Sequence, residues 1–224
     1  MSARALVYLH GFASSPRSSK ARFFAERAGL AQLAYCCPDL NEPDFTALTV
    51  SRMIEQVRAQ IARLPPGPVA LVGSSLGAFV ALHAAARQAE DGDGEHPIDR
   101  LVFLAPALNL VPSLEDEFGA ARMAEWERTG RLEVFHYADN AMRHLGWPFM
   151  PDARLYDSNA VAVEIPTLIY QGRRDEVVRA AAVEAWAAPR PWVTLRLVDD
   201  GHQLLDHLEA MWRDVAVFVG DQDE

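Results

Sequence analysis

The 224-residue sequence has little cysteine, no long hydrophobic run and a shortage of positive charge. Its two cysteines, Cys36 and Cys37, are neighbours, and a bond between them would strain the geometry that a disulfide prefers, so we expect two reduced thiols. No stretch approaches the roughly 18 uninterrupted apolar residues that span a bilayer. The 21 Lys and Arg residues against 31 Asp and Glu residues give a net charge of −10. This charge disfavours nucleic acid and anionic membrane surfaces as partners, because both are bound through positive charge.

The composition is that of a folded protein. Hydrophobic residues make up 50% of the chain and charged residues 23%, which argues against disorder. The length predicts one domain over residues 1–224. The apolar run Ala5–Leu9 is too short for the core of a signal peptide, so together with the reduced thiols it predicts a cytoplasmic protein.

Short apolar runs alternate with longer segments of helical period. Several of the runs are nearly apolar on both faces, which is typical of strands in a parallel sheet covered by helices on each side. We expect strands over Ala5–His10, Ala34–Cys37, Val69–Gly73, Leu101–Leu104, Thr167–Tyr170 and Val193–Val198. We expect helices over Ser18–Leu30, Thr46–Leu64, Leu76–Gln88, Val178–Ala187 and Gln203–Val219. This alternation predicts an α/β fold with right-handed crossovers.

Residues 106–164 break the alternation. A structureless loop of that size inside a compact domain is improbable. We expect a small helical insertion that sits as a cap over the carboxyl edge of the sheet, since lids commonly gate sites there. The alternative is a peripheral subdomain that only covers an exposed edge.

The pattern Gly73-Ser74-Ser75-Leu76-Gly77 is the strongest sign of chemistry in the chain. It follows an apolar run and opens a helical segment, which is the context that holds a serine in a strained turn with its hydroxyl clear of the sheet. Both glycines are needed because the residues two before and two after the serine approach each other closely. We therefore predict that Ser75, and not Ser74, is a nucleophile; the alternative is a glycine-rich turn with an idle serine.

An acyl-transfer enzyme also needs two backbone N–H groups aimed at the developing oxyanion. We expect one from Leu76, the residue after the nucleophile. We expect the other from Phe12, because Gly11 lets the loop after the first strand bend close to the reacting carbon. His10 is expected to brace this loop by hydrogen bonds rather than to transfer protons.

A serine hydroxyl needs a base, and the base needs an orienting group. Asp175 and His202 each come just after the carboxyl end of a predicted strand, as Ser75 does, so the fold would bring all three to one edge of the sheet. The order Ser, Asp, His along the chain is that of the α/β-hydrolases. His207 is the second candidate for the base, and Asp199 and Asp200 are rivals of Asp175.

The remaining histidines, which are His83, His96, His136 and His144, have no partner spacing and are interpreted as structural. The sequence contains no phosphate-binding loop and no dinucleotide fingerprint, and it has no zinc-site spacing, so we expect no zinc site.

The blocks Tyr8–Lys20 and Val72–Gly77 together resemble the small bacterial YqiA-type esterases of the α/β-hydrolase superfamily. The resemblance continues through Gly172–Val178 and Gly201-His202. It implies the α/β-hydrolase fold, which has a mostly parallel central sheet with helices on both faces, and a serine esterase without metal or organic cofactor. It also implies Ser75, Asp175 and His202 as the triad. Residues 106–164 are longer and differently composed than the usual connection of that family.

The sequence therefore predicts a hydrolase that cleaves a carboxylic ester, or a thioester, of a small molecule through an acyl-enzyme. The aromatic residues Trp126, Trp147 and Phe149 would contact an apolar substrate group or form the core of the cap, and the sequence favours neither reading. Two alternatives stay open: a peptidase of the same fold, and a non-catalytic binding protein on a hydrolase scaffold.

Overall fold

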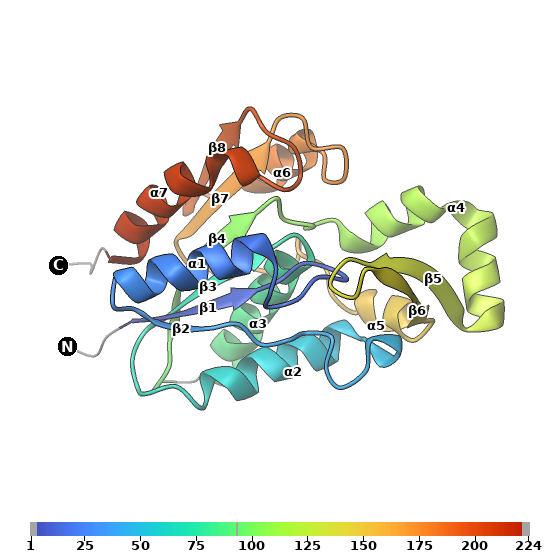
Figure 1. The fold of residues 1–224 in the computed structure, drawn as a ribbon, viewed down its shortest axis with the longest axis horizontal. Helices are drawn as coiled ribbons and strands as arrows, with labels where there is room; N and C mark the ends of the chain where they lie inside the picture. The colour runs from blue at the N-terminus through green and yellow to red at the C-terminus, as the bar shows by residue number, and fades with distance from the viewer. Residues whose placement is uncertain (1–3, 93, 221–224) are drawn as a thin grey trace.

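Six parallel strands form the central sheet, in the spatial order β2-β1-β3-β4-β7-β8 (Figure 1). The computed structural model describes residues 4–92 and 94–220, so residues 1–3, 93 and 221–224 of the predicted domain lie outside the described residues. The strands are β1 (Ala5–Leu9), β2 (Ala34–Cys36), β3 (Val69–Ser74), β4 (Ile98–Leu104), β7 (Thr167–Gly172) and β8 (Val193–Val198). All six expected strands are confirmed, each within a few residues of its predicted bounds.

Alternate residues of the strands face opposite layers of helices. Leu6 and Tyr8 of β1 pack with α1 (Ser19–Leu30) and α7 (Leu208–Gly220). Val7 and Leu9 of the same strand face the other layer. That layer contains α2 (Val50–Ile61), α3 (Leu76–Asp91) and α6 (Ala180–Ala187). Because both faces are covered, inner strands such as β1 and β3 are nearly continuous apolar runs, which is why the sequence identified them.

The five predicted helices are present, and two of them begin four or five residues later than predicted. A short 3-10 turn, η1 (Phe45–Ala47), precedes α2, which begins only at Val50, after its N-cap Thr49. A second 3-10 turn, η2 (Leu205–His207), precedes α7.

The prediction of a helical insertion over residues 106–164 is only partly right. The segment contains α4 (Leu110–Thr129), the antiparallel strands β5 (Arg131–His136) and β6 (Ala141–Gly146), and the short helix α5 (Phe149–Ala153). α4 is kinked at Gly119, whose φ of 68° is not helical, and Gly130 ends it in the left-handed conformation. We call residues 106–164 the cap. In Figure 1 its elements lie together at the end of the molecule opposite the two termini.

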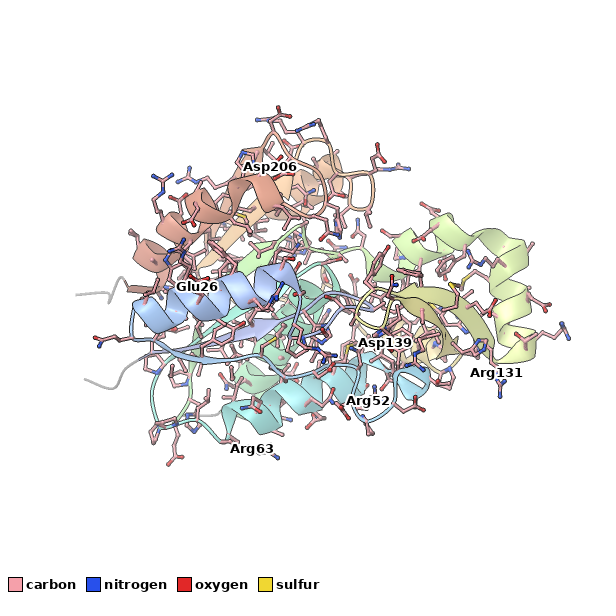
Figure 2. All side chains as sticks on the ribbon, in the orientation of Figure 1. Glu26, Arg52, Arg63, Arg131, Asp139 and Asp206 are labelled. Carbon is pink, nitrogen blue, oxygen red and sulfur yellow. The ribbon has the colours of Figure 1, made fainter. Side chains whose placement is uncertain are left out.

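The turn between β5 and β6 lies against the main domain. In Figure 2, Asp139 in this turn lies toward the main domain, whereas Arg131 at the start of β5 lies at the far end. The amide of Ala138 donates a hydrogen bond to the carbonyl of Ala13, in the loop after β1, at 3.3 Å. The His136 ring lies 4.7 Å from that of Phe45. The hairpin is thus attached to the loops at the carboxyl edge of the sheet.

The two cysteines, Cys36 at the end of β2 and Cys37 just beyond it, are free thiols. None of the helices in the described ranges combines the length and the apolar character that crossing a membrane requires.

Candidate active site at the carboxyl edge of the sheet

Ser75 occupies the strained turn between β3 and α3. Its φ of 53° and ψ of −114° lie in a region that non-glycine residues rarely adopt, and such strain persists only where the surroundings enforce it. A Cβ atom on Gly73 would lie 2.5 Å from the carbonyl oxygen of Gly77, and one on Gly77 would lie 2.1 Å from that of Leu9. Glycine is therefore required at both ends of the motif, as the sequence pattern predicts.

Asp175 and His202 form a hydrogen-bonded pair. Asp175 follows β7, His202 follows β8, and these strands are neighbours, so the two residues meet at the sheet edge. Nδ1 of His202 donates to Oδ2 of Asp175 at 2.9 Å. The side chain of Asp175 has no exposed surface and that of His202 is 16% exposed, so the carboxylate is buried beneath an imidazole that reaches solvent.

Four donors surround the Asp175 carboxylate. Oδ1 accepts from the backbone amides of Val177 and Val178, at 2.9 and 2.8 Å. Oδ2 accepts from Nε2 of Gln171 at 3.0 Å in addition to His202. Burial acts to raise the pKa of Asp175, but these hydrogen bonds outweigh it and hold the pKa below its ordinary value. Asp175 is thus held as an anion, which suits a group that orients an imidazole and offsets its positive charge.

Gln171, at the buried end of β7, is a site residue that the sequence analysis missed. Its Nε2 also donates to the carbonyl of Val178 at 2.9 Å, which fixes its orientation toward Asp175. Its place four residues before Asp175 carries no recognisable motif, so no signal in the sequence points to it.

The Ser75 hydroxyl and His202 line one cavity. Within residues 4–92 and 94–220, neither side chain has a hydrogen bond to the other; the partner of His202 is Asp175. Hydrogen bonds of catalytic groups are often long in unliganded structures and tighten when substrate binds. The geometry thus brings the carboxylate and imidazole into contact and places the serine on the same cavity.

The two predicted oxyanion donors, the amides of Phe12 and Leu76, have no hydrogen-bond acceptor among the described residues. A Cβ atom on Gly11 would lie 3.5 Å from Cβ of Ser75, so the loop before Phe12 passes directly beside the serine. Leu76 is the first residue of α3, where backbone N–H groups lack partners within the helix. Both donors are therefore available beside Ser75.

His10 braces the loop after β1. Its Nε2 accepts a hydrogen bond from the amide of Leu40 at 2.9 Å, and Nδ1 donates to the carbonyl of Gly11 at 2.9 Å. Both ring nitrogens are thus engaged by the backbone, in agreement with the structural role expected for this histidine.

His207 and Asp200, the alternative candidates for the base and the acid, pair with each other. Nδ1 of His207 lies 3.0 Å from Oδ2 of Asp200, which also accepts from the amide of Asp206. Asp199 instead forms an exposed ion pair with Arg174 at 2.8 Å. Among the described residues, the loops after β7 and β8 thus carry two carboxylate–imidazole pairs, Asp175–His202 and Asp200–His207. Of the two histidines, His202 lines the cavity that Ser75 lines, and His207 lines neither of the cavities described next.

Two cavities meet at Ser75. The first, of about 620 Å³, is bounded by the start of α4 and by α6, and we call it the α4 cavity. The second, of about 910 Å³, is bounded by the β5–β6 hairpin and the start of α1, and we call it the hairpin cavity. Phe12, Ser75 and Val177 are among the residues that line both. A substrate bound at Ser75 could therefore extend in two directions.

The three predicted pocket aromatics take different places. Trp126 and Phe149 are almost fully buried and line the α4 cavity, so they belong both to the core of the cap and to a cavity wall. Trp147 lines neither cavity, and its ring packs edge-on against that of Trp126, 5.3 Å away.

In the part of the chain that the structure describes, no three His, Cys, Asp or Glu side chains converge as a metal site would require.

Several solved structures share this fold. A protein from Agrobacterium vitis S4 that was assigned as a hydrolase matches with a TM-score of 0.87 at 23% identity, over 97% of this chain and 88% of that one. The mouse alpha/beta hydrolase domain-containing protein 10 matches with a TM-score of 0.78 at 20% identity, over 96% and 89%. The monoacylglycerol lipase of Paleococcus ferrophilus matches with a TM-score of 0.73 at 14% identity, over 96% and 93%. These likenesses show that the chain has the α/β-hydrolase fold.

Among curated protein sequences, no significant match to the chain was found. A protein family does match, and it is described as an uncharacterised protein family, UPF0227. The match runs over residues 5–219, which is nearly the whole chain, and it agrees with the resemblance that the motifs suggested. The chain belongs to the UPF0227 family.

Proposed function

We propose that this chain is a serine hydrolase that cleaves carboxylic esters through an acyl-enzyme. The observation that carries the proposal is the Asp175–His202 pair on the cavity that a strained serine also lines. The fold shared with hydrolases supports it, although a fold alone does not select a reaction.

The reaction would proceed in two halves. Ser75 Oγ attacks the ester carbonyl carbon while Nε2 of His202 takes the hydroxyl proton. The amides of Phe12 and Leu76 bind the oxyanion, and loss of one such donor typically costs about 10²–10³ in rate. When the tetrahedral intermediate collapses, His202 gives the proton to the departing alkoxide and the acyl group stays on Ser75. Water, activated by His202, then releases the acid.

The walls of the α4 cavity suit an apolar acyl group. They include Leu108, Leu110, Phe118, Trp126 and Val183. Burial of apolar substrate surface there would contribute roughly 25 cal/mol per Å². The acyl part of a preferred substrate is therefore expected to be apolar.

Hydrolysis of 4-nitrophenyl esters of increasing acyl length tests this proposal, together with labelling by a fluorophosphonate. We expect turnover and labelling in the wild type, and neither in Ser75→Ala. The matched control is Ser74→Ala, which removes the neighbouring hydroxyl from the same cavity and should keep the label.

The outcomes separate the alternatives. Labelling without turnover of any ester would shift the weight to acyl-thioesters, assayed by release of the free thiol, and then to peptides. Failure of both labelling and turnover would contradict the proposal and leave a binding protein on a hydrolase scaffold.

A further inference from the structure

Lys20 is a buried cation on the wall of the hairpin cavity. It lies in the first turn of α1, is only 7% exposed, and lines the cavity together with Ser75 and His202. Within residues 4–92 and 94–220 its ammonium group has neither a hydrogen bond nor an ion pair. Nζ retains some solvent-accessible surface. Because Lys20 lines the hairpin cavity, this surface faces the cavity.

The neighbouring carboxylates do not serve as partners for Lys20. Asp175 and Asp200 act on it electrostatically, yet neither lies within ion-pairing distance. The first is engaged by His202 and the second by His207, each with backbone amides in addition. The ammonium group of Lys20 is therefore able to donate hydrogen bonds to a bound ligand.

An unpartnered ammonium is costly to bury. Burial lowers the pKa of Lys20 to about 8, even though the two nearby aspartates act to raise it. At pH 7 the group is still roughly 90% protonated. A cation kept in this state beside a reactive serine is suited to bind an anion that arrives with the substrate.

The other charges on this cavity cancel. Arg17 and Arg122 are exposed at its rim, as are Glu117 and Glu133. Arg122 is already engaged, since it donates to the carbonyl of Glu133 and lies over the ring of Phe118. Lys20 thus supplies the net positive charge of the cavity.

His202 indicates which end of the substrate enters this cavity. It lines the hairpin cavity and does not line the α4 cavity. In acyl transfer the imidazole must reach the departing oxygen to return its proton, so the leaving group lies on the side of the histidine. The leaving alcohol therefore occupies the cavity of Lys20, and the acyl group occupies the α4 cavity.

The mouth of the hairpin cavity also carries exposed apolar side chains, beside the charged residues at its rim. Most of the large hydrophobic side chains that the described residues expose lie around it: Phe135, Tyr137 and Met142 of the hairpin, with Val177 and Leu205 of the loops after β7 and β8. An alcohol that fills this cavity would contact these side chains with an apolar or aromatic part. Its charged group would reach the Lys20 wall.

We propose that Lys20 is a specificity-determining residue that binds a carboxylate or phosphate on the alcohol part of the ester. The inference rests on the proposed function, since it assigns the two cavities by the roles of Ser75 and His202. The preferred substrate is thus an anionic ester: an apolar acyl group joined to an alcohol that combines an apolar part with a negative charge.

Matched aryl esters test the proposal. Three butyrate esters have nearly the same leaving group and differ in charge: those of 4-hydroxybenzoate, of the neutral 4-hydroxybenzamide, and of 4-hydroxyphenyl phosphate. We expect the wild type to favour at least one anionic ester over the benzamide ester by about 10-fold or more in kcat/KM, because a charge-assisted hydrogen bond discriminates by about that factor. The phosphate and carboxylate arms show which anion the site prefers.

The variant Lys20→Met should abolish this preference mainly by raising KM for the anionic ester. Turnover of the benzamide ester should stay within about threefold of wild type, and Lys20→Arg should keep part of the preference. Because the lysine is buried without a partner, the methionine variant should melt at the same temperature as wild type or higher at pH 7. If Lys20 only balanced Asp175 and Asp200, the methionine variant would melt lower and lose activity on both esters alike, which would overturn the proposal.

A measurement on the wild type alone guards against a variant that does not fold. KM for the anionic ester should rise above about pH 8, as Lys20 loses its proton, while KM for the benzamide ester should not. The carboxylates that act on Lys20 are Asp175 and Asp200, whose pKa values lie below the ordinary value, so both stay anionic in this range. The other titratable or charged residues that line the same cavity are Tyr8, Arg17, Glu117, Arg122, Glu133, Tyr137 and His202. Burial raises the pKa of Tyr8, so it stays neutral.

The two proposals fail in different ways. If the benzamide ester is hydrolysed and neither anionic ester is preferred, the assignment of Lys20 is wrong and the esterase stands. If no ester is hydrolysed and Ser75 takes no fluorophosphonate, the proposed function is wrong.

Discussion

Replacing Asp175 by asparagine should remove most of the activity by changing which nitrogen of His202 carries the proton. Oδ1 of Asp175 accepts from two backbone amides, so an asparagine must keep its only carbonyl oxygen on that side. Its NH₂ group then faces Nδ1 of His202 and can only donate. The imidazole must then accept this hydrogen bond at Nδ1 and carry its own proton on Nε2. In this tautomer Nε2 cannot take the proton from Ser75.

The expected loss in kcat for Asp175→Asn is about 10⁴-fold, or roughly 5.5 kcal/mol in activation free energy, which is the scale of such a tautomer change in serine hydrolases. Gln171 blocks a simple rescue. Its Nε2 would oppose the new NH₂ group, and turning its amide over would set Oε1 against the carbonyls of Gly172 and Val178. This conflict should lower the free energy of unfolding by about 1–3 kcal/mol.

The assay is kcat on a neutral 4-nitrophenyl ester, measured on protein whose folding has been checked by circular dichroism and thermal melting. The matched control is Asp200→Asn, which disturbs the other carboxylate–imidazole pair and should stay within about tenfold of wild type. A rate for Asp175→Asn within tenfold of wild type, or an equal collapse in Asp200→Asn, would refute the assignment of the acid.

Three further predictions concern the scaffold. Gly77→Ala should lower the free energy of unfolding, measured by urea titration, by about 3 kcal/mol or more, because the new Cβ would overlap the Leu9 carbonyl. The control Gly29→Ala, at an open helical position, should raise the free energy of unfolding by about 0.5–1 kcal/mol. Equal effects of the two substitutions would contradict the close packing of the motif. Trp126→Phe should cost about 1–3 kcal/mol, since it leaves the buried Leu145 carbonyl without the indole donor, and an unchanged melting temperature would contradict this. Because the pKa of Asp175 is lowered in the folded protein, the unfolded chain binds a proton at this carboxylate first as pH falls. The ionised Asp175 therefore stabilises the fold fully above about pH 4, and this stabilisation is lost below that pH. Melting temperatures measured from pH 7 to 3 should fall less steeply in Asp175→Asn than in wild type, and parallel curves would refute the linkage.

The sheet could be predicted because its inner strands, such as β1 and β3, are buried on both faces and are therefore almost wholly apolar. The cap could not be predicted correctly in the same way. β5 alternates exposed and buried residues over only six positions, and its partner β6 is mostly exposed, so neither stands out from a helical background. What holds the hairpin is its contact with the loops after β1 and before α2, which are distant in sequence.

The site shows the same division. The approach of Asp175 and His202 follows from their place after neighbouring strands, and Ser75 lies two strands away in the sheet order. The position of these three residues directly after predicted strands is therefore enough to select them as candidates from the sequence. Gln171 and Lys20 lie within a strand and a helix, and their roles depend on which side chains the folded chain brings near them.

In the proposed reaction Ser75 carries the acyl group during turnover. Mass spectrometry of protein quenched in acid during hydrolysis of a butyrate ester would detect this acyl-enzyme. We expect a butyryl mass increment on the peptide that contains Ser75, and none in Ser75→Ala. An increment on another residue, or undiminished ester turnover in Ser75→Ala, would contradict this proposal.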